Sequence, residues 1–197
     1  MKYIGAVVTD TTEARKDRAE TLIHIEGLKK PLQIVVSWTS QRAPEALEEL
    51  TAGTRIIFAA REHTLSQRTL VDEGNGAVSI VLFATGVFYD LVCDQDATVE
   101  DLYAGFGPQD LEFTGTVADV DERGTATVVM QRHGTIQPLM ATFKDLAGIE
   151  AGTELVFTAA ERSLSWRTVL DDAGRRSIVP AVTATSVTPV LRGVTGT

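Results

Sequence analysis

The feature that most constrains this chain is an internal repeat. An Ala-Gly-Thr motif at residues 52–54 recurs 99 residues later at 151–153. At the same offset, the apolar triplet Ile56-Ile57-Phe58 falls on Leu155-Val156-Phe157. Self-similarity of this kind is the signature of a duplicated structural unit. The sequence therefore predicts two diverged copies of one small domain, at residues 3–92 and 112–191.

The offset between the copies changes along the chain in a way that supports this interpretation. It is 99 for Arg68-Thr69 and Arg167-Thr168 and 100 for the stretches 84–87 and 184–187. Upstream it is 107 for Pro31-Leu32 and Pro138-Leu139, and 110 for Gly5 and Gly115. Each change falls where a loop or a helix can absorb an insertion. We expect domain 1 at 1–92, an acidic linker at 93–110 and domain 2 at 111–197.

Size and composition are those of a small globular protein. The 197 residues give each copy about 80 to 90, near the lower limit for an independent core. No apolar run reaches the ~20 residues needed to span a bilayer, and the first residues do not resemble a signal peptide. The single cysteine, Cys93, excludes an internal disulfide and a site with several thiolate ligands. We expect a cytoplasmic protein.

The net charge of −9 is unevenly distributed. Residues 1–92 carry 10 Lys/Arg and 12 Asp/Glu, residues 93–110 carry five acids and no base, and residues 111–197 carry 8 and 10. More than half of the excess therefore lies in the linker. Each copy is close to neutral and could present a basic face, although an acidic protein that avoids polyanions stays an open alternative.

Turn signals and β-branched runs predict mostly strands. In the first copy they cover 3–8, 21–25, 31–38, 54–60, 64–71 and 78–89, with a short helix at 43–50 and a turn at 73–76. The second copy repeats this order, with a helix cut to about one turn at 146–151 and a hairpin turn at 172–174. One helical turn, 99–104, is expected in the linker, which could pack through Tyr103 and Phe106. The fold class is all-β with short helices: two tandem five-stranded barrels of the OB type.

Residues 35–87 resemble the OB domain of bacterial and phage single-stranded DNA-binding proteins. The matching residues are Val35-Val36-Ser37-Trp38, Ala43–Leu50, Ala52-Gly53, Thr54–Phe58, Arg61, Arg68, Asp72, the Gly74-Asn75-Gly76 turn and Ala84-Thr85; the second copy carries the run over 151–187. The resemblance implies binding of single-stranded DNA without sequence preference in replication, recombination or repair. Family members assemble four OB domains, which implies a homodimer here.

Two departures from the family limit what the resemblance carries over. Where the family usually places Trp, this chain has Leu32, Leu70 and Leu170. Residues 191–197 lack the acidic, hydrophobic tip through which family members recruit replication and repair proteins. Stacking by those Trp residues and recruitment through a tail are therefore not implied.

Binding of single strands needs cations along the phosphates and flat side chains beneath the bases. The candidate nucleic-acid-binding residues are Lys29, Lys30, Trp38, Arg61 and Arg68 in the first copy, and Lys144, Arg162, Trp166, Arg167, Arg175 and Arg176 in the second. Arg68 and Arg167 occupy one repeat position, and each could instead hold Asp72 or Asp171 in a hairpin salt bridge. Trp38 could stack on bases or pack at the barrel end, and Trp166 could stack or serve a protein interface. With Trp166 and more arginines, the second hairpin should bind more tightly.

Phe58, Phe157 and Phe143 are expected in the core, whereas Phe83, Phe88 and Tyr89 should be divided between core and interface. Catalysis finds no support, because His24, His63 and His133 are scattered and no Gly-rich phosphate loop is present. We expect no enzyme, no cofactor and no metal. The alternative function is an OB-fold protein-interaction or structural module, such as a replisome or phage-assembly component, that binds no nucleic acid.

Overall fold

The computed structural model describes residues 1–9, 12–15, 18–39, 50–61, 64–72, 74–94, 96–107, 109, 111–123, 125–132, 135–145, 149–160 and 162–190. The expected helix at 43–50 lies outside these ranges except for Leu50. Of the shorter helix expected at 146–151, residues 146–148 lie outside them, and its last residue, Ala151, lies in a turn. Within the described ranges, no helix is long and apolar enough to cross a bilayer.

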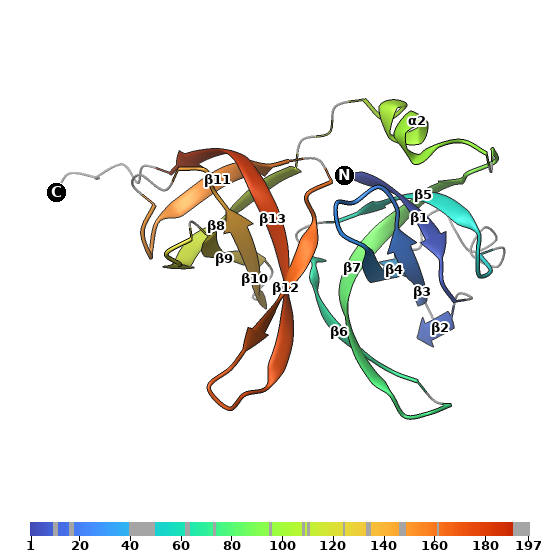
Figure 1. Cartoon of the computed structure of the whole chain (residues 1–197), viewed down its shortest axis with the longest axis horizontal. Coiled ribbons are helices and arrows are strands. Elements are labelled where there is room, and N and C mark those ends of the chain that lie inside the picture. The colour runs from blue at the N-terminus through green and yellow to red at the C-terminus, as the bar shows by residue number, and fades with distance from the viewer. Residues whose placement is uncertain are drawn as a thin grey trace. The chain divides into compact units, whose positions relative to one another are not determined.

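The first copy forms a closed barrel (Figure 1). Its strands are β1 (Lys2–Val7), β2 (Thr12–Arg15), β3 (Arg18–Ile25), β4 (Leu32–Trp38), β5 (Arg55–Ala60), β6 (Ser66–Val71) and β7 (Val78–Leu91). Strand β1 pairs antiparallel with both β3 and β5, and β3 pairs antiparallel with β4. Strand β7 closes the ring by pairing antiparallel with β5 and parallel with β4. The ring order β1-β3-β4-β7-β5 is that of an OB-fold.

The second copy repeats this topology. Its strands are β8 (Leu111–Val120), β9 (Thr125–Arg132), β10 (Thr135–Thr142), β11 (Glu154–Ala159), β12 (Ser165–Leu170) and β13 (Arg176–Pro189). The ring β8-β9-β10-β13-β11 closes through the parallel pair β10–β13. The predicted fold class, two tandem OB-type five-stranded barrels, is confirmed.

In each copy the strand that precedes the long last strand lies outside the ring, and in the first copy β2, which pairs only with β3, does so as well. Strand β6 pairs with the first part of β7, from Val71 opposite Val78 to Ser66 opposite Phe83. Strand β12 lies beside β13 in the same way. The predicted turns are confirmed in their glycines, since Gly76 and Gly174 have φ of +69° and +74°, a region that other residues rarely adopt. Each long hairpin is therefore an arm that projects from its barrel (Figure 1).

The core of each barrel is centred on one phenylalanine. It lies in the strand that follows the repeated Ala-Gly-Thr motif. Phe58 packs between Tyr3 and Trp38, with ring centroids 5.7 and 6.0 Å away. Phe157 lies between Phe113 and Phe143 at 5.3 and 5.4 Å. Alternate residues of β5 and β11 are buried, as expected for strands with one face inward. The predicted core positions of Phe58, Phe143 and Phe157 are confirmed.

Gly5 and Gly115 confirm the offset of 110, because each pairs with the first buried residue of the facing strand, Ile56 or Leu155. A Cβ on Gly5 would lie 2.3 Å from Ile23 Cγ2, and one on Gly115 would lie 2.6 Å from a Val128 methyl carbon. Such approaches are well inside van der Waals contact. A glycine at this point is what lets the first strand of each barrel coil across its neighbour.

Two of the predicted offsets are wrong by two residues. Thr85 and Thr183 are structural counterparts, since their backbone N–H groups donate to the hydroxyls of Thr64 and Ser163, which are 99 residues apart. Thr85 and Thr183 differ by 98 in number, not 100. The reason is the hairpin turn: the Asp72 N–H donates to the carbonyl of Ala77, five residues on, whereas the Asp171 N–H donates to that of Arg175, four residues on. The second turn is shorter by one residue, so the offset falls.

The same correction carries to the third strand of each barrel. Ser37 pairs with Thr85, and Thr142 pairs with Thr183. Ser37 and Thr142 are therefore counterparts 105 residues apart, not the 107 that the Pro-Leu match predicted. With this register, Trp38 corresponds to Phe143.

The acidic segment between the copies packs on the first barrel. Helix α2 (Val99–Ala104) confirms the expected helical turn and is capped by Thr98, whose side chain accepts from the Asp101 N–H. Tyr103 is buried; its hydroxyl donates to the Glu26 carbonyl at 2.9 Å and accepts from the Ile4 N–H at 3.3 Å. Phe106 packs edge-on against Tyr103. This segment therefore covers the end of the first barrel where β1 begins.

Candidate nucleic-acid interface

The second arm presents an exposed Trp-Arg pair. In β12, every residue after Ser165 is exposed, including Trp166 at 44% and Arg167. Arg167 forms no ion pair with any residue that the structure describes. Neighbouring residues of a strand point to opposite faces, so the side chains of Trp166 and Arg167 lie on opposite sides of the arm. Each from its own face of the arm, the exposed ring can accept a base and the unpaired guanidinium can contact a phosphate.

Arg68 occupies the same position on the first arm but is held in place. Its Nη2 donates to Glu20 Oε2 at 2.7 Å, and its guanidinium carbon lies 5.2 Å from the centre of the Phe83 ring. The acid comes from β3, the arginine from β6 and the ring from β7. The guanidinium is therefore bonded at its edge and covered on one face.

The second barrel lacks both partners of this arginine. Glu20 pairs with Ser37, and Thr125 pairs with Thr142, the counterpart of Ser37. Thr125 thus stands where the first barrel has Glu20. By the same register, Phe83 faces Val35 and Ala181 faces Met140, so Ala181 replaces the ring. The different freedom of Arg68 and Arg167 follows from these two replacements.

The hairpin salt bridges considered for Arg68 and Arg167 are not those that form. Arg68 bonds Glu20, whereas Asp72 accepts from the Gly74 N–H. Asp171 pairs with Arg175, whose Nε lies 2.6 Å from Asp171 Oδ2. The Arg175 N–H, then the Arg175 side chain and the Ala173 N–H hold the pKa of Asp171 below its usual value. Arg175 thus closes the turn, although its side chain is 83% exposed.

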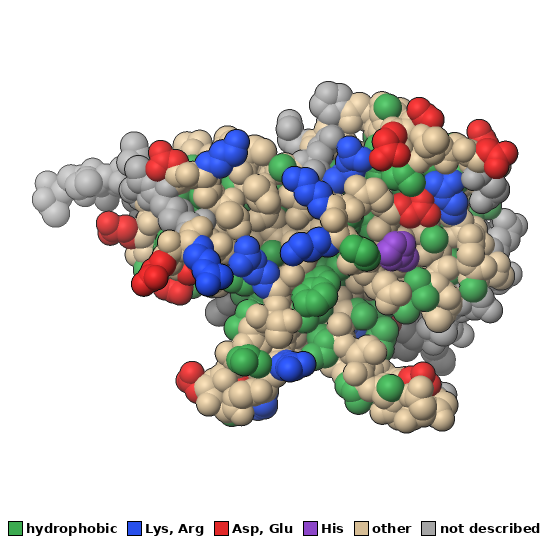
Figure 2. Space-filling model, in the orientation of Figure 1, with side chains coloured by type: hydrophobic (Ala, Val, Ile, Leu, Met, Phe, Trp, Pro, Cys, Tyr) green, Lys and Arg blue, Asp and Glu red, His purple; other side chains and the backbone are tan. Residues whose placement is uncertain are grey.

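Arg167 also acts on Asp121, in the turn between β8 and β9. The pKa of Asp121 is lowered chiefly by the Thr125 N–H, 2.8 Å away, and further by the Arg123 N–H and by the charges of Arg167 and Arg123. Arg123 is also exposed, and no motif in the sequence marks it. On the face drawn in Figure 2, several Lys and Arg side chains lie on the second barrel.

Trp38 is a core residue and is not available for stacking. It is 2% exposed, its Nε1 donates to Thr21 Oγ1 at 2.8 Å, and its ring packs edge-on against Phe58 and Phe88. Of the two hypotheses for Trp38, packing at the barrel end is therefore correct and stacking on bases is not. Trp38 lies on the same face of β4 as Ile34 and Val36, which are both fully buried.

The remaining predicted cations are dispersed. Lys29 and Lys30 are exposed in the loop before β4, and Arg61 is exposed at the base of the first arm, where its N–H donates to the Thr85 carbonyl. Arg162 is half-buried in a turn with φ +55°. Arg176 is exposed at the start of β13.

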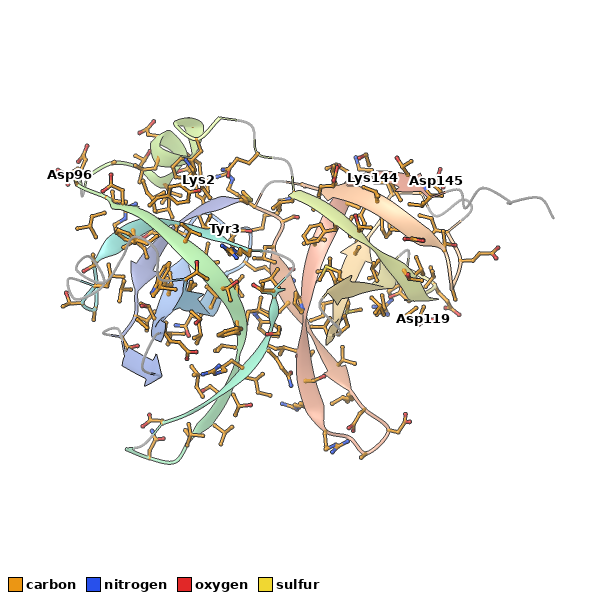
Figure 3. The ribbon with its side chains drawn as sticks, turned by 180° about the vertical axis from the view of Figure 1, so that it is seen from behind. Lys2, Tyr3, Asp96, Asp119, Lys144 and Asp145 are labelled. Atoms are coloured by element: carbon orange, nitrogen blue, oxygen red, sulfur yellow. The ribbon has the colours of Figure 1, made fainter. Side chains whose placement is uncertain are left out.

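Lys144 lies apart from the second arm. It follows the end of β10 beside Asp145, as Figure 3 shows, and Thr142 pairs with Thr183 in β13. Thr183 is seven residues along β13 from Arg176, roughly 23 Å at the rise of a strand. Trp166 and Arg167 lie at the start of β12, whereas Arg175 and Arg176 lie at the turn end of the same hairpin, and Lys144 lies outside that hairpin.

Sequence reasoning missed the residues that decide which arginine is free. Glu20 and Phe83 lie in no recognisable motif. Their importance could have been inferred from the sequence only by aligning the two copies with the corrected offsets, which places Thr125 and Ala181 at their positions. It also missed Lys2, whose ammonium lies 4.6 Å from the centre of the exposed Tyr89 ring. Among the described residues, no cluster of three His, Cys, Asp or Glu could hold a metal ion.

Comparisons with known proteins do not assign the chain to a family. No protein-family model matches it, and no curated protein matches it. Solved structures similar to it include the Ifi202 HINa domain in complex with 20-bp dsDNA, at 10% identity, 96% of this chain, 95% of that chain and a TM-score of 0.27. The p204 HINb domain aligns at 11% identity over 96% of this chain and 97% of that chain, with a TM-score of 0.24. At such TM-scores these likenesses carry no argument, and the fold rests on the strand topology.

Proposed function

We propose that this protein binds single-stranded DNA without sequence preference and protects it during replication, recombination or repair. The observation that carries the proposal is the exposed Trp166 beside the unpaired Arg167 on an arm of an OB-type barrel. The resemblance of residues 35–87 and 151–187 to bacterial single-stranded DNA-binding proteins agrees with it. Binding would involve no chemical step, so we propose no enzymatic activity, and we propose a cytoplasmic location.

Each of the two residues supplies one part of such an interaction. A base stacked on an aromatic ring contributes about 1–3 kcal/mol, largely independent of sequence. An arginine at a phosphate contributes through the release of counterions, which makes the affinity depend on salt. Arg176 on the same hairpin and Arg175 at its turn add positive charge farther along the arm.

The test is a titration of the protein with a 30-nucleotide oligo-dT while Trp fluorescence is followed at low and high salt. Because Trp38 is buried, quenching should come from Trp166 and disappear in Trp166→Phe. Trp166→Ala with Arg167→Ala should weaken binding by about 1–3 kcal/mol or more. The matched control is Arg68→Ala, which removes the arginine at the same position of the first arm and should cost less than Arg167→Ala. Absence of binding by the folded wild-type protein at low salt would refute the proposal.

A second candidate function is a protein-interaction module that binds no nucleic acid. The exposed apolar side chains of Val71 and Val78 on the first arm and Leu170 on the second favour it, being 61%, 65% and 62% exposed. The net charge of −9 also favours it. This candidate stands if the oligonucleotide titration shows no binding and the arms are protected when a protein partner is added.

We also propose a homodimer, because the resembling family assembles four OB domains and this chain holds two. Sedimentation equilibrium should then give twice the chain mass of 21.2 kDa. A mass of one chain at all micromolar concentrations would contradict this assembly.

A further inference from the structure

We infer that Glu20 occupies the phosphate position of the first arm, so that Arg68 is withheld from nucleic acid in the wild-type protein. The inference rests on the proposed function and deepens it, because it names the residue that makes the two barrels unequal. In this view the first barrel carries the same basic position as the second, with a carboxylate of its own bound there.

The contact has the geometry of a phosphate contact. Arg68 Nη2 donates to Glu20 Oε2 at 2.7 Å, within the range of a charge-assisted hydrogen bond. The Glu20 side chain is 16% exposed, against 42% for that of Arg68. A phosphate oxygen that approaches Arg68 Nη2 must therefore displace a carboxylate that is already mostly shielded from water.

The other side of the guanidinium is also occupied. Arg68 lies over the Phe83 ring, an arrangement in which the ring's negative face attracts the cation. The ring limits the directions in which the side chain can turn toward a ligand. Arg68 can therefore leave Glu20 only by losing contacts on two sides.

Glu20 itself is held on a fixed strand. It pairs with Ser37 across β3 and β4, and the next residue, Thr21, is 1% exposed and accepts the Trp38 Nε1–H in the core. Because neighbouring residues point to opposite faces, the inward Thr21 keeps Glu20 outward beneath the arm. The carboxylate is thus presented to Arg68 by the barrel wall.

The second barrel is the natural comparison within the same chain. Thr125 replaces Glu20, and its hydroxyl lies 3.4 Å from that of Thr142. Ala181 replaces Phe83, and Arg167 is exposed without an ion pair in the described part of the chain. At the same repeat position, the first barrel therefore has an arginine bonded to a carboxylate, and the second has an arginine that can bind a phosphate.

The test uses Glu20→Thr, which installs the residue of the second barrel, and Glu20→Gln, which keeps the size of the side chain. Both full-length variants are titrated with oligo-dT of 10 to 40 nucleotides beside the wild type and beside Glu112→Thr, in which an exposed glutamate of β8 undergoes the same change of charge. Both Glu20 variants should bind roughly three- to tenfold more tightly at low salt. Their plot of log affinity against log salt should steepen by about 0.7, the value for one more phosphate contact on a single strand.

Two further variants tie the gain to Arg68. Adding Arg68→Ala to Glu20→Thr should abolish it. In the Trp166→Ala/Arg167→Ala background, Glu20→Thr should restore part of the lost binding. Thermal melting confirms that each variant is folded.

The outcomes separate this inference from the proposed function. If the wild type binds and both Glu20 variants match it, only the inference fails. If Glu112→Thr gives the same gain, or the gain persists without Arg68, the effect is one of net charge and the inference is overturned. If neither the wild type nor any Glu20 variant binds at low salt, the proposed function and the inference fail together.

Discussion

The two barrels share a backbone plan but differ in how they use the same positions. Arg68 of the first arm is bonded to Glu20 and lies over Phe83, whereas Arg167 of the second arm has Thr125 and Ala181 in those places. A repeated residue is therefore not a repeated function. What an arginine can bind depends on partners that come from other strands, and those partners have diverged.

The cores differ by a coupled pair. Trp38 donates to Thr21 in the first barrel. In the second, Phe143 takes the place of Trp38, and Ala126, which pairs with Ala141 as Thr21 pairs with Val36, takes the place of Thr21. An indole N–H needs an acceptor when it is buried, and a phenyl ring does not. The packing around Phe58 and Phe157 is thus similar in the two copies, whereas the hydrogen-bond donor Trp38 and its acceptor Thr21 are both replaced in the second.

The largest expected effect tests whether those cores are equivalent. Phe58→Ala and Phe157→Ala each remove a ring that is at most 1% exposed and is packed between two other rings. Each should lower the free energy of unfolding by about 3–5 kcal/mol. Urea denaturation followed by circular dichroism measures this. A cost below about 1 kcal/mol for one variant would show that its barrel is not built on that ring.

The glycines of the first strands come next. Gly5→Ala and Gly115→Ala should each destabilise by about 1–3 kcal/mol, because the new methyl group overlaps Ile23 or Val128. The two sites should respond differently to a second substitution. Ile23→Ala should relieve much of the strain at Gly5, whereas Val128→Ala should relieve less at Gly115, where the Val129 carbonyl oxygen lies 2.8 Å from the new Cβ. Equal rescue in both barrels would contradict this distinction.

A smaller effect is expected for the donor–acceptor pair. Trp38→Phe removes the donor and leaves Thr21 Oγ1 buried without it, and Thr21→Ala leaves the indole N–H without its acceptor. Each single change should cost about 1–3 kcal/mol. The double variant, which copies the second barrel, should cost less than the sum by about 1 kcal/mol. Strict additivity in thermal or urea denaturation would indicate that the hydrogen bond is not the reason for the pairing.

The smallest effect concerns the turns of the second barrel. The pKa values of Asp121 and Asp171 lie below the usual 3.8, so both carboxylates favour the folded state above that pH, and this contribution is lost as the pH falls through the lowered pKa. Arg175→Ala should raise the pKa of Asp171 but leave it below 3.8, because the Arg175 backbone N–H remains. Arg167→Ala should raise that of Asp121 only slightly. Carbon-detected NMR titration measures both, and a return of Asp171 to 3.8 would contradict the backbone assignment.

Much of the fold was predictable because it depends on local pattern. The alternation of apolar residues in 55–60 and 154–159, the glycines of the two hairpin turns and the spacing of the repeat gave the strand order and the arms. The offsets at 84–87 and 31–32 could not be obtained in this way. Short apolar strands match each other in several registers, and only backbone pairing distinguishes a shift of two residues, which keeps every side chain on its face.

The candidate site was predictable in part. The Trp166-Arg167 pair was found because a projecting arm has little core to bury a ring. Trp38 remained open, because the pattern of one strand does not say whether its last residue lies under the barrel end or beyond it. Arg68 remained open as well, because Glu20 is 48 residues away in the chain.

The sequence by itself determined that the chain is a duplicated all-β protein with two projecting hairpins, since period, turn residues and alternation are local properties. The tertiary structure alone decided that Trp38 is core, that Arg68 is held by Glu20 and Phe83, and that Arg175 rather than Arg167 bonds Asp171. The physical reason is that burial and ion pairing depend on which strands lie side by side and in which register. Those relations join residues that are far apart in the sequence.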